Sequence, residues 1–498
     1  MIFLVVIDRF LVMTKLPDQS ITVQSLMNVS GVRFGTSGVR GLVSEMTHEL
    51  CFAYVQAFLQ VISAVPGSRV AIGMDFRPSS PDIASACAAA AYHAGLSVDF
   101  CGALPTPALS YYAQTQGIAG IMVTGSHIPF DRNGIKFYGH AGEITKVDEA
   151  NISNAVVVLP VEIPLHPLPE LNPAAGQLYI DRYSSFFPQQ CLVGMRLGFY
   201  EHSSVARDIL RKILESLGAE VISLGRTEKF VPIDTEAVSD VDIEQARRWA
   251  SEVGFDAILS TDGDADRPLI GDEHGDWLRG DIVGMLCAQY LGAQNVATPV
   301  SCNTAIELCG RFTNVARTRI GSPYVIESME KMLAAGMSNV VGFEANGGFL
   351  LGSTIEKHER TLSPLMTRDA VIPILSLLAM SKEQGITLSQ LSRNLPARYT
   401  ASGRLQSFPA EVSQRTLLDL SASMAAIGNL LGAIGTQAKA IDQTDGLRIF
   451  LENGEIVHFR PSGNAPELRC YAEADSQDRA NWLASECLRL IRDYCKIK

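Results

Sequence analysis

The stretch Asp256-Ala257-Ile258-Leu259-Ser260-Thr261-Asp262-Gly263-Asp264-Ala265-Asp266-Arg267 joins an apolar run to an acidic one. Residues 257–260 predict a buried strand, an element of layered α/β folds. Alternate residues of an extended segment point the same way, so Asp262, Asp264 and Asp266 can converge on one hard cation. Without a cation the three carboxylates would repel one another and raise one another's pKa. The alternative interpretation is an acidic surface turn.

The ligand set indicates which cation would bind. Oxygen ligands with no nearby Cys or His favour magnesium, manganese or calcium over zinc. An EF-hand loop would end at Glu273, but it needs glycine where Arg267 stands, and residues 268–272 predict strand and turn. Three carboxylates leave room for substrate oxygens, as at the magnesium sites of phosphoryl-transfer enzymes.

The whole chain has 498 residues, which suits roughly three or four domains. A hydrophobic content of 47% and a charged content of 19% fit a globular protein with a substantial core. The net charge of −12 argues against a nucleic-acid partner and against an anionic membrane surface.

Cysteine usage and the start of the chain bear on location. The ten cysteines include no Cys-x-x-Cys pair, which indicates reduced thiols in a cytoplasmic protein. The apolar start, Met1 to Met13, is interrupted by Asp8 and Arg9 and is too short to span a bilayer. We therefore expect no targeting or membrane segment.

Three similar units follow one another along the chain. Each has a predicted strand, a helix and a second strand, at 69–74, 80–94 and 97–101, then at 196–200, 204–217 and 220–224, and then at 295–300, 303–311 and 314–320. Strands that alternate with helices at this spacing predict α/β layers with largely parallel sheets.

The last hundred residues differ. Asn453-Gly454 lies between the predicted strands 447–451 and 456–460, a strong hairpin signal, and a strand at 468–472 and a closing helix at 479–494 follow. We therefore predict three related α/β mixed-sheet domains and a smaller C-terminal α+β domain. The predicted limits are 1–30 for an N-terminal extension and 31–170, 171–279, 280–394 and 395–498 for the domains.

A second chemical stretch lies around Ser126. Residues 121–123 predict a strand that leads into Thr124-Gly125-Ser126-His127, and Lys136 follows. The glycines of the α/β-hydrolase nucleophile elbow are missing. Ser126 is either an ordinary turn serine or a serine that carries phosphate, whose oxygens could complete a magnesium shell. Lys136 could then transfer a proton or neutralise charge.

Three further loops carry polar side chains. Arg460-Pro461-Ser462-Gly463-Asn464 with Arg469 could hold a dianion, or could form a polar turn. Glu344 and Asn346, in a Gly-rich loop, could grip the hydroxyls of a sugar. The loop 33–41 contains Arg40, but its glycines do not have the spacing of a dinucleotide site.

Taken in order, these five stretches resemble the α-D-phosphohexomutases, most closely the phosphomannomutase/phosphoglucomutase group, from about Arg33 to the C-terminus. The resemblance implies four domains around a central cleft. It implies phosphoserine at Ser126, with Asp262, Asp264 and Asp266 as ligands of Mg²⁺, which the serine phosphate would also contact. It counts Arg40, Arg267, Lys136 and His127 among the catalytic residues. Sugar and phosphate binding would fall to Glu344, Asn346, Gly321, Arg460, Ser462, Gly463, Asn464 and Arg469.

The chain departs from the family pattern at several positions. Ile128 stands where the family commonly has Asn, and Asn346 and Gly348 replace the serine and histidine of the sugar loop. His358 is a remote candidate for that histidine's role. The loop 200–204 is also less glycine-rich than in the family. These differences bear on the identity of the sugar more than on the type of reaction.

The expected reaction interconverts hexose 6-phosphate and hexose 1-phosphate, with mannose phosphate as the first expected small-molecule partner and glucose phosphate as the second. A hexose 1,6-bisphosphate would be the intermediate and the activator. Three alternatives stay open at this point: a phosphoglucosamine mutase, a magnesium-dependent sugar phosphatase and a non-catalytic sugar-phosphate sensor. The oligomeric state is open between monomer and dimer.

Overall fold

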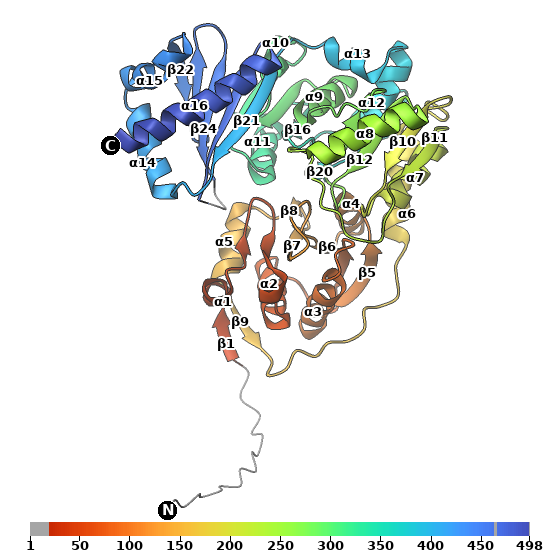
Figure 1. Ribbon diagram of the computed structural model, residues 1–498. Coiled ribbons are helices and arrows are strands. Elements are labelled where there is room, and N and C mark those ends of the chain that lie inside the picture. The colour runs from red at the N-terminus through yellow and green to blue at the C-terminus, as the bar shows by residue number, and fades with distance from the viewer. Residues whose placement is uncertain (1–18, 463–465, 498) are drawn as a thin grey trace, which may run out of the picture.

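Three units of the chain share one sheet topology in the computed structural model, which describes residues 19–462 and 466–497 (Figure 1). In the first unit, β4 (Arg69–Met74) lies between β5 (Ser97–Ala103) and β6 (Ala119–Val123) and is parallel to both. A fourth strand, β7 (Arg132–Gly139), pairs antiparallel with β6.

The second and third units repeat this order. The corresponding strands of the second are β10 (Arg196–Tyr200), β11 (Glu220–Leu224), β12 (Ala257–Thr261) and β13 (Pro268–Gly271). Those of the third are β14 (Asn295–Pro299), β15 (Asn314–Thr318), β16 (Val340–Phe343) and β17 (Phe349–Leu351). In each unit the strands are parallel except the last, so the sheets are mixed, and the expectation of three related α/β units is confirmed.

Further strands extend two of these sheets. The first sheet continues through β3 (Val39–Leu42) to β2 (Arg33–Phe34), with β8 (Gly142–Glu143) on β7, and the third continues to β20 (Leu365–Asp369). Two small sheets pair β1 (Gln19–Thr22) with β9 (Val156–Leu159), and β18 (Ile355–Lys357) with β19 (Arg360–Leu362).

Helices connect and cover the sheets. The first unit has α1 (Val23–Ser30), α2 (His48–Val61), α3 (Ser80–His93), α4 (Thr106–Gln116) and α5 (Lys146–Asn154). Then come α6 (Ala174–Phe186), α7 (Arg207–Ser216), α8 (Asp240–Val253), α9 (Gly280–Tyr290), α10 (Ala305–Leu308), α11 (Ser322–Ala334), α12 (Val371–Gln384) and α13 (Leu388–Arg393). The helix expected at 303–311 is thus only one turn long. Residues 371–381 of α12 are all buried, which agrees with the long apolar run there.

The C-terminal unit is a five-stranded antiparallel sheet in the order β21 (Tyr399–Leu405), β25 (Leu468–Ala474), β24 (Ile456–Pro461), β23 (Leu447–Leu451) and β22 (Ala438–Asp442). The predicted hairpin joins β23 to β24, with Gly454 at a φ of 84°. The helices are α14 (Ala410–Ser421), α15 (Met424–Leu431), the 3₁₀ turn η2 (Gly432–Ile434) and α16 (Gln477–Ile497). This confirms the smaller α+β unit.

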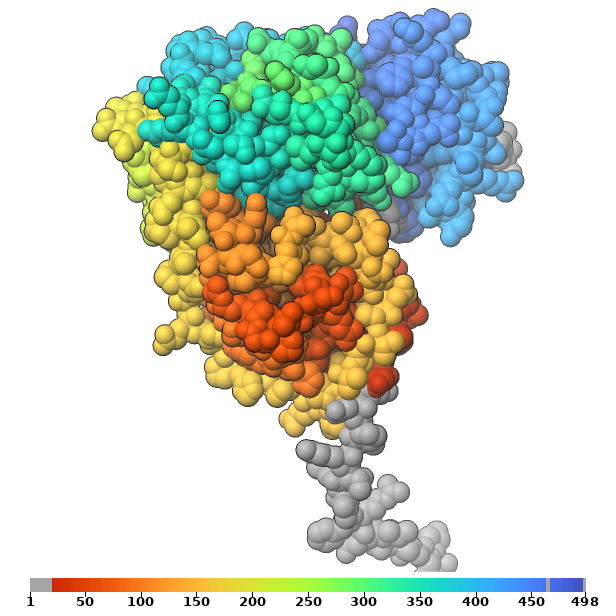
Figure 2. Space-filling model, turned by 180° about the vertical axis from the view of Figure 1, so that it is seen from behind, coloured from red at the N-terminus to blue at the C-terminus, as the bar shows by residue number. Residues whose placement is uncertain are grey.

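The first unit packs against the third, where α4 and β8 contact β20, and the space-filling view shows this boundary from behind (Figure 2). The predicted domain limits stay predictions, and the apolar segment Met1 to Met13 lies outside the described residues. Across the described ranges no single helix could cross a membrane by length and hydropathy; α14 and the segment 424–434 pass that test only as a pair bent by 111°.

Candidate active site

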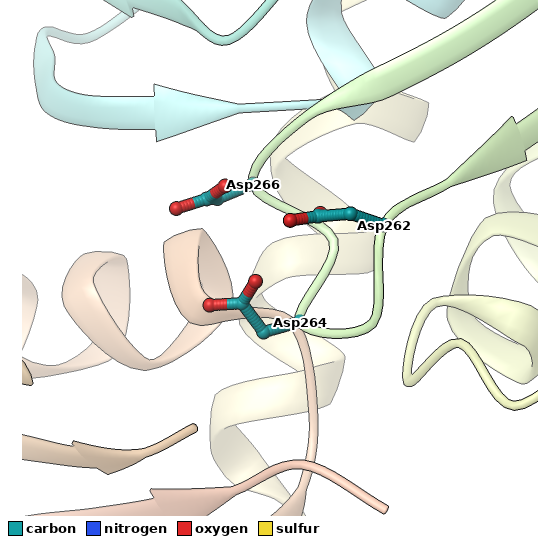
Figure 3. Close-up of side chains that lie close together, drawn as sticks. All are labelled: Asp262, Asp264 and Asp266. Atoms are coloured by element: carbon teal, nitrogen blue, oxygen red, sulfur yellow. The ribbon is translucent and has the colours of Figure 1, made fainter. Parts of the chain in front are cut away.

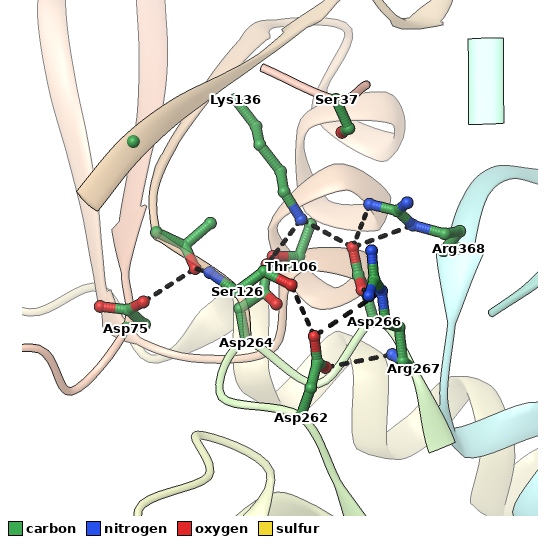
Figure 4. Close-up of polar contacts among 12 residues, drawn as sticks. Ser37, Asp75, Thr106, Ser126, Lys136, Asp262, Asp264, Asp266, Arg267 and Arg368 are labelled. Carbon is green, nitrogen blue, oxygen red and sulfur yellow. Dashed lines mark hydrogen bonds and ion pairs between the residues drawn. The ribbon is translucent and has the colours of Figure 1, made fainter. Parts of the chain in front are cut away.

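Three of the loops singled out in the sequence occupy equivalent places in the repeated topology. Residues 124–131 join β6 to β7, residues 262–267 join β12 to β13, and residues 344–348 join β16 to β17. Each loop therefore connects the third strand of its unit to the antiparallel fourth. Figure 4 shows the loops of the first and second units side by side, where Ser126 meets Asp262. Arg368 donates both to Asp266 and to Glu344, which brings the third loop to the same place.

The acidic loop gathers three buried carboxylates. One carboxylate oxygen each from Asp262, Asp264 and Asp266 lies within 4.8 Å of the others, and the residues are at most 1% exposed. Figure 3 shows the three side chains turned toward a common space. Oδ1 of Asp264 and Oδ1 of Asp266 are buried and have no hydrogen-bond partner among the described residues. Buried oxygens without partners are costly, so this donor set fits a hard cation.

The charges around this loop act in opposite directions. Burial, and then the charges of Asp264 and Asp266, raise the pKa of Asp262 well above its usual range. Burial alone would raise the pKa of Asp266, but Arg368, Lys136 and Arg267 together lower it below its usual range. Asp266 is therefore a carboxylate at neutral pH, and a cation would also favour the charged form of Asp262.

Ser126 is held beside the acidic loop. Its hydroxyl donates to Oδ2 of Asp262 at 2.6 Å, and the residue is fully buried. Its φ of 54° is a left-handed conformation that non-glycine residues rarely adopt, and such strain is concentrated at functional sites. The hydroxyl of Thr124 accepts from the backbone N–H of Ser126 at 2.8 Å and fixes the turn.

A buried arginine that the sequence reasoning missed supports the serine loop, residues 124–131, through its backbone carbonyls. Arg77 donates to the backbone carbonyls of Ser126 at 3.0 Å and Pro129 at 2.7 Å, and also to the carboxylate of Asp75. A side chain at Gly125 would place Cβ 2.6 Å from the guanidinium of Arg77, so the glycine admits this contact. The signal available in the sequence was Asp75-Phe76-Arg77 directly after a buried strand.

Lys136, on β7, crosses to the acidic loop. Its Nζ donates to Oδ2 of Asp264 and to Oδ2 of Asp266, each at 2.6 Å. The hydroxyl of Thr106, another residue missed at the sequence level, donates to the same oxygen of Asp264 at 2.7 Å. These contacts hold the Oδ2 atoms and leave the Oδ1 atoms of both carboxylates free for another ligand.

Two arginines beside Ser126 each have a buried nitrogen that makes no hydrogen bond in the described part of the chain. These nitrogens are Nη2 of Arg40 and Nε of Arg267, and the latter lies 3.6 Å from Oδ1 of Asp266. Burial, with the nearby charges of Arg267 and Arg368, lowers the pKa of Arg40 to about 10. An anion bound here would provide the missing acceptors, and phosphoryl groups suit guanidinium donors.

His127 is neutral in this environment. Burial, and then the charges of Arg267 and Arg40, hold the pKa of His127 far below its usual range. Nη1 of Arg267 lies 3.0 Å from Nδ1 of His127. Because arginine can only donate, Nδ1 is an acceptor, and it lies 3.3 Å from the Ser126 hydroxyl oxygen.

The third loop presents Glu344 and Asn346, which are 4% and 5% exposed. Oδ1 of Asn346 accepts from the backbone N–H of Gly348 at 2.9 Å, so the side chain stabilises its own loop. Glu344 accepts from Arg368, a residue on β20 that the sequence reasoning missed. His358 lies in the turn between β18 and β19, where it pairs with Glu383 of α12, and it does not join this site.

The fourth unit contributes residues to a cleft beside this site. Arg469 on β25 lines a cleft of about 430 Å³ together with His127 and Arg267, so residues of three units share one cavity. Arg460 donates to Oδ2 of Asp445 at 2.9 Å, and the same oxygen accepts from the N–H of Ile320, the residue before Gly321. Ser462 is 8% exposed; Gly463 and Asn464 lie outside the described residues.

The loop after β10 supports the acidic loop from behind. Nε2 of His202 lies 2.9 Å from the carbonyl oxygen of Thr261, and Ser204 shares a 2.6 Å hydrogen bond with the Thr261 hydroxyl. Both residues are fully buried. Polar side chains at 202–204 thus hold the base of the acidic loop, at the place where the sequence is less glycine-rich than the family pattern.

Comparison with known proteins gives matches along the whole described fold. The four models of the phosphoglucomutase/phosphomannomutase family match in order: alpha/beta/alpha domain I at 31–157, domain II at 177–275, domain III at 279–399 and the C-terminal domain at 412–490. A phosphomannomutase of Salmonella muenchen is 49% identical, over 91% of this chain and 94% of that protein. A phosphoglucosamine mutase of Alkaliphilus oremlandii is 27% identical, over 93% and 99%.

A solved structure shows the same fold. The crystal structure of a phosphoglucomutase/phosphomannomutase family protein from Burkholderia thailandensis superimposes with a TM-score of 0.71 at 19% identity, and the match covers 93% of this chain and 97% of that one. At this identity the likeness concerns the fold alone.

Proposed function

Because this chain belongs to the phosphoglucomutase/phosphomannomutase family, we propose that it is a phosphomannomutase that interconverts mannose 6-phosphate and mannose 1-phosphate through phosphoserine at Ser126. One arrangement carries the proposal. The Ser126 hydroxyl is hydrogen-bonded to Asp262 of an acidic loop in which Asp264 and Asp266 each keep a buried oxygen without a hydrogen bond, and buried guanidinium nitrogens of Arg40 and Arg267 also make none. A phosphoryl group on Ser126 would bring acceptors to these guanidinium nitrogens and an oxygen ligand to a metal held by the carboxylates.

The metal in this proposal is Mg²⁺, held by Asp262, Asp264 and Asp266 and by the serine phosphate. When bound, it would neutralise charge on the phosphoryl group in transfer. Arg40 and Arg267 would bind the equatorial oxygens, and their preset positions would cost no reorganisation during the reaction.

The reaction has two transfers. Phospho-Ser126 gives its phosphoryl group to the free hydroxyl of the bound mannose phosphate: the bond between phosphorus and the serine oxygen breaks, and the proton that the sugar hydroxyl loses is replaced by one on that serine oxygen. Lys136, an ammonium paired with Asp264 and Asp266, is the candidate for the proton transfer to the serine oxygen. The 1,6-bisphosphate turns in the cleft and returns its other phosphoryl group to Ser126. A hexose 1,6-bisphosphate added in trace amounts would activate the enzyme by phosphorylating Ser126.

The far end of the sugar phosphate needs a second grip. Arg469 faces the cleft from the fourth unit, opposite His127 and Arg267. We assign the non-reacting phosphate to Arg460, Ser462, Gly463, Asn464 and Arg469, and the sugar hydroxyls to Glu344 and Asn346, with Gly321 beside them. A loop that recognises phosphate and not a particular carbon suits a substrate that binds in two orientations.

Burial of the reacting groups favours a mutase over a sugar phosphatase. Ser126 and the three aspartates are at most 1% exposed, so water reaches them poorly. A phosphatase needs water at the phosphoenzyme, whereas a mutase must exclude it. All ten cysteines lie in the described residues and are free, which supports our proposal of a cytoplasmic location.

One experiment tests the proposal. The purified protein is incubated with Mg²⁺, a trace of hexose 1,6-bisphosphate and, separately, mannose 1-phosphate, glucose 1-phosphate or glucosamine 1-phosphate. The 6-phosphate product and inorganic phosphate are measured together. We expect isomerisation that is fastest with mannose 1-phosphate. Release of inorganic phosphate without isomerisation would contradict a mutase, and a preference for glucosamine 1-phosphate would contradict the assigned sugar.

A further inference from the structure

Gly348 ends the sugar loop and packs directly against Arg368 of β20. A Cβ at position 348 would lie 2.7 Å from Cδ, 2.9 Å from Cγ and 3.0 Å from Cβ of Arg368. These atoms form the base of the arginine side chain, so a movement of its tip would not relieve the overlap. The φ of Gly348 is not positive, so its backbone does not itself require glycine. The absence of a side chain at 348 is what admits Arg368.

Arg368 contacts two of the loops at once. The residue is 3% exposed. Its Nη1 donates to Oε2 of Glu344 at 3.1 Å, while Nε and Nη2 donate to Oδ2 of Asp266 at 3.1 and 2.7 Å. A guanidinium is planar and presents its donors in a fixed fork, so the two carboxylates are held in one geometry relative to each other. Figure 4 shows the double contact to Asp266.

The pattern of occupied oxygens shows what this bridge does. Oδ2 of Asp266 accepts from Arg368 and from Lys136, which leaves Oδ1 buried and without a hydrogen bond in the described structure, 3.6 Å from Nε of Arg267. On Glu344 the arginine holds Oε2, so Oε1 is the oxygen left for a sugar hydroxyl. Each carboxylate thus keeps one oxygen for its bound ligand because Arg368 holds the other.

We propose that Arg368 is a positioning residue that orients the acidic loop through Asp266 and the sugar loop, residues 344–348, through Glu344. We also propose that position 348 must be glycine to leave room for the Arg368 side chain. The inference rests on the proposed function, because the metal and sugar roles of these carboxylates belong to it. Arg368 is buried and its Nε, Nη1 and Nη2 all donate to the two carboxylates, so it acts through them and not on the substrate. Its loss must therefore affect two separate properties, the affinity for Mg²⁺ and the binding of the sugar phosphate.

The test compares Arg368→Lys, Arg368→Gln and Gly348→Ala. Lysine keeps the charge but has one nitrogen, which cannot serve both carboxylates as a fork does. We expect each variant to bind Mg²⁺ about tenfold more weakly, by calorimetry on the unphosphorylated protein, and to raise the KM for mannose 1-phosphate about tenfold. At saturating Mg²⁺, kcat should fall less than KM rises. The double variant Gly348→Ala/Arg368→Gln should be no worse than Arg368→Gln.

Two variants serve as matched controls. Gly428→Ala adds the same methyl group at a glycine of α15 where a Cβ would meet no atom within 4 Å. Arg360→Gln removes an arginine of the third unit that donates to the backbone carbonyls of Ser185 and Phe187. Both should keep the Mg²⁺ affinity and the KM within twofold of the wild type.

The outcomes separate this inference from the proposed function. If Arg368→Lys keeps either the Mg²⁺ affinity or the KM for mannose 1-phosphate within twofold of the wild type, the proposed role of Arg368 is wrong, because one side chain would then not position both loops. Additive effects of Gly348→Ala and Arg368→Gln would show that the glycine does not act through the arginine. An inactive wild type would instead contradict the mutase. If Arg368→Gln fails to fold by circular dichroism, Arg368→Lys and Gly348→Ala decide the matter.

Discussion

The hydroxyl of Ser126 donates a 2.6 Å hydrogen bond to Asp262, which joins the serine loop of the first unit to the acidic loop of the second. The two loops occupy the same place in their units, between the third strand and the antiparallel fourth. Repetition of one topology around a shared centre therefore supplies both halves of a phosphoryl-transfer site. The same repetition supplies the sugar loop from the third unit.

Ser126→Ala should lower mutase turnover by orders of magnitude, because no other group replaces the phosphoryl acceptor. Tryptic peptides of the wild type, treated with hexose 1,6-bisphosphate, should carry phosphate at Ser126 by mass spectrometry. The matched control is Ser153→Ala on α5, where the hydroxyl donates only to the carbonyl of Glu149 in its own helix. Near-normal activity of Ser126→Ala would remove this residue from its proposed role.

Asp264→Asn should weaken Mg²⁺ binding about tenfold or more while the fold stays intact. Oδ1 of Asp264 is one of the buried oxygens without a hydrogen bond. In asparagine this position holds either an uncharged oxygen, which is a weaker metal ligand, or an NH₂ group, which is none. Calorimetric titration measures the affinity, and circular dichroism checks the fold. Asp272→Asn, at a buried aspartate beyond β13 that accepts backbone N–H groups, is the control. An unchanged affinity in Asp264→Asn would refute its assignment as a ligand.

The sequence predicted those parts of the fold and site that local patterns encode. Strand ends followed by polar loops, and the Asn453-Gly454 turn, depend on neighbouring residues, so the fold class is confirmed. The contacts of Thr106 and Arg368 join residues more than a hundred positions apart, and nothing beside either residue in the sequence indicates its partner. The family resemblance could show that position 348 had changed, but only the fold shows which side chain occupies the space.

Arg77→Met should destabilise the protein by about 3–5 kcal/mol, because it leaves Asp75 buried without its cation and several carbonyls without a donor. Denaturant unfolding monitored by circular dichroism measures the loss. Arg69→Met, at the start of β4, the strand that precedes Arg77, removes an exposed ion pair with Asp99 and should cost only about 0–1 kcal/mol. Equal losses in the two variants would show that Arg77 is not a structural support of the serine loop.

His458 should make the protein sensitive to acid. Burial lowers its pKa to about 4, from the ordinary 6.5. Between these values the unfolded chain binds a proton that the folded chain does not, so stability is full above pH 6.5 and falls as the pH drops toward 4. His458 should change the free energy of unfolding by up to roughly 1.4 kcal/mol per pH unit in this range. His458→Gln should have a correspondingly flatter dependence in urea unfolding between pH 6.5 and 4.5. An unchanged slope would contradict the assignment.

Phosphorylation of Ser126 should tighten Mg²⁺ binding, because the two would bring opposite charges into one buried site. Burial and the charges of Asp264 and Asp266 raise the pKa of Asp262 well above its usual range, so the site does not readily hold a further negative charge without a cation. Mg²⁺ alone or a phosphoryl dianion alone would add an uncompensated charge to this buried site, whereas the two together compensate each other. Since such coupling is typically 5–150-fold, we expect the phosphorylated protein to bind Mg²⁺ about tenfold more tightly by calorimetry. Ser126→Ala exposed to the same bisphosphate should show no change, and equal affinities of the two wild-type forms would refute the coupling.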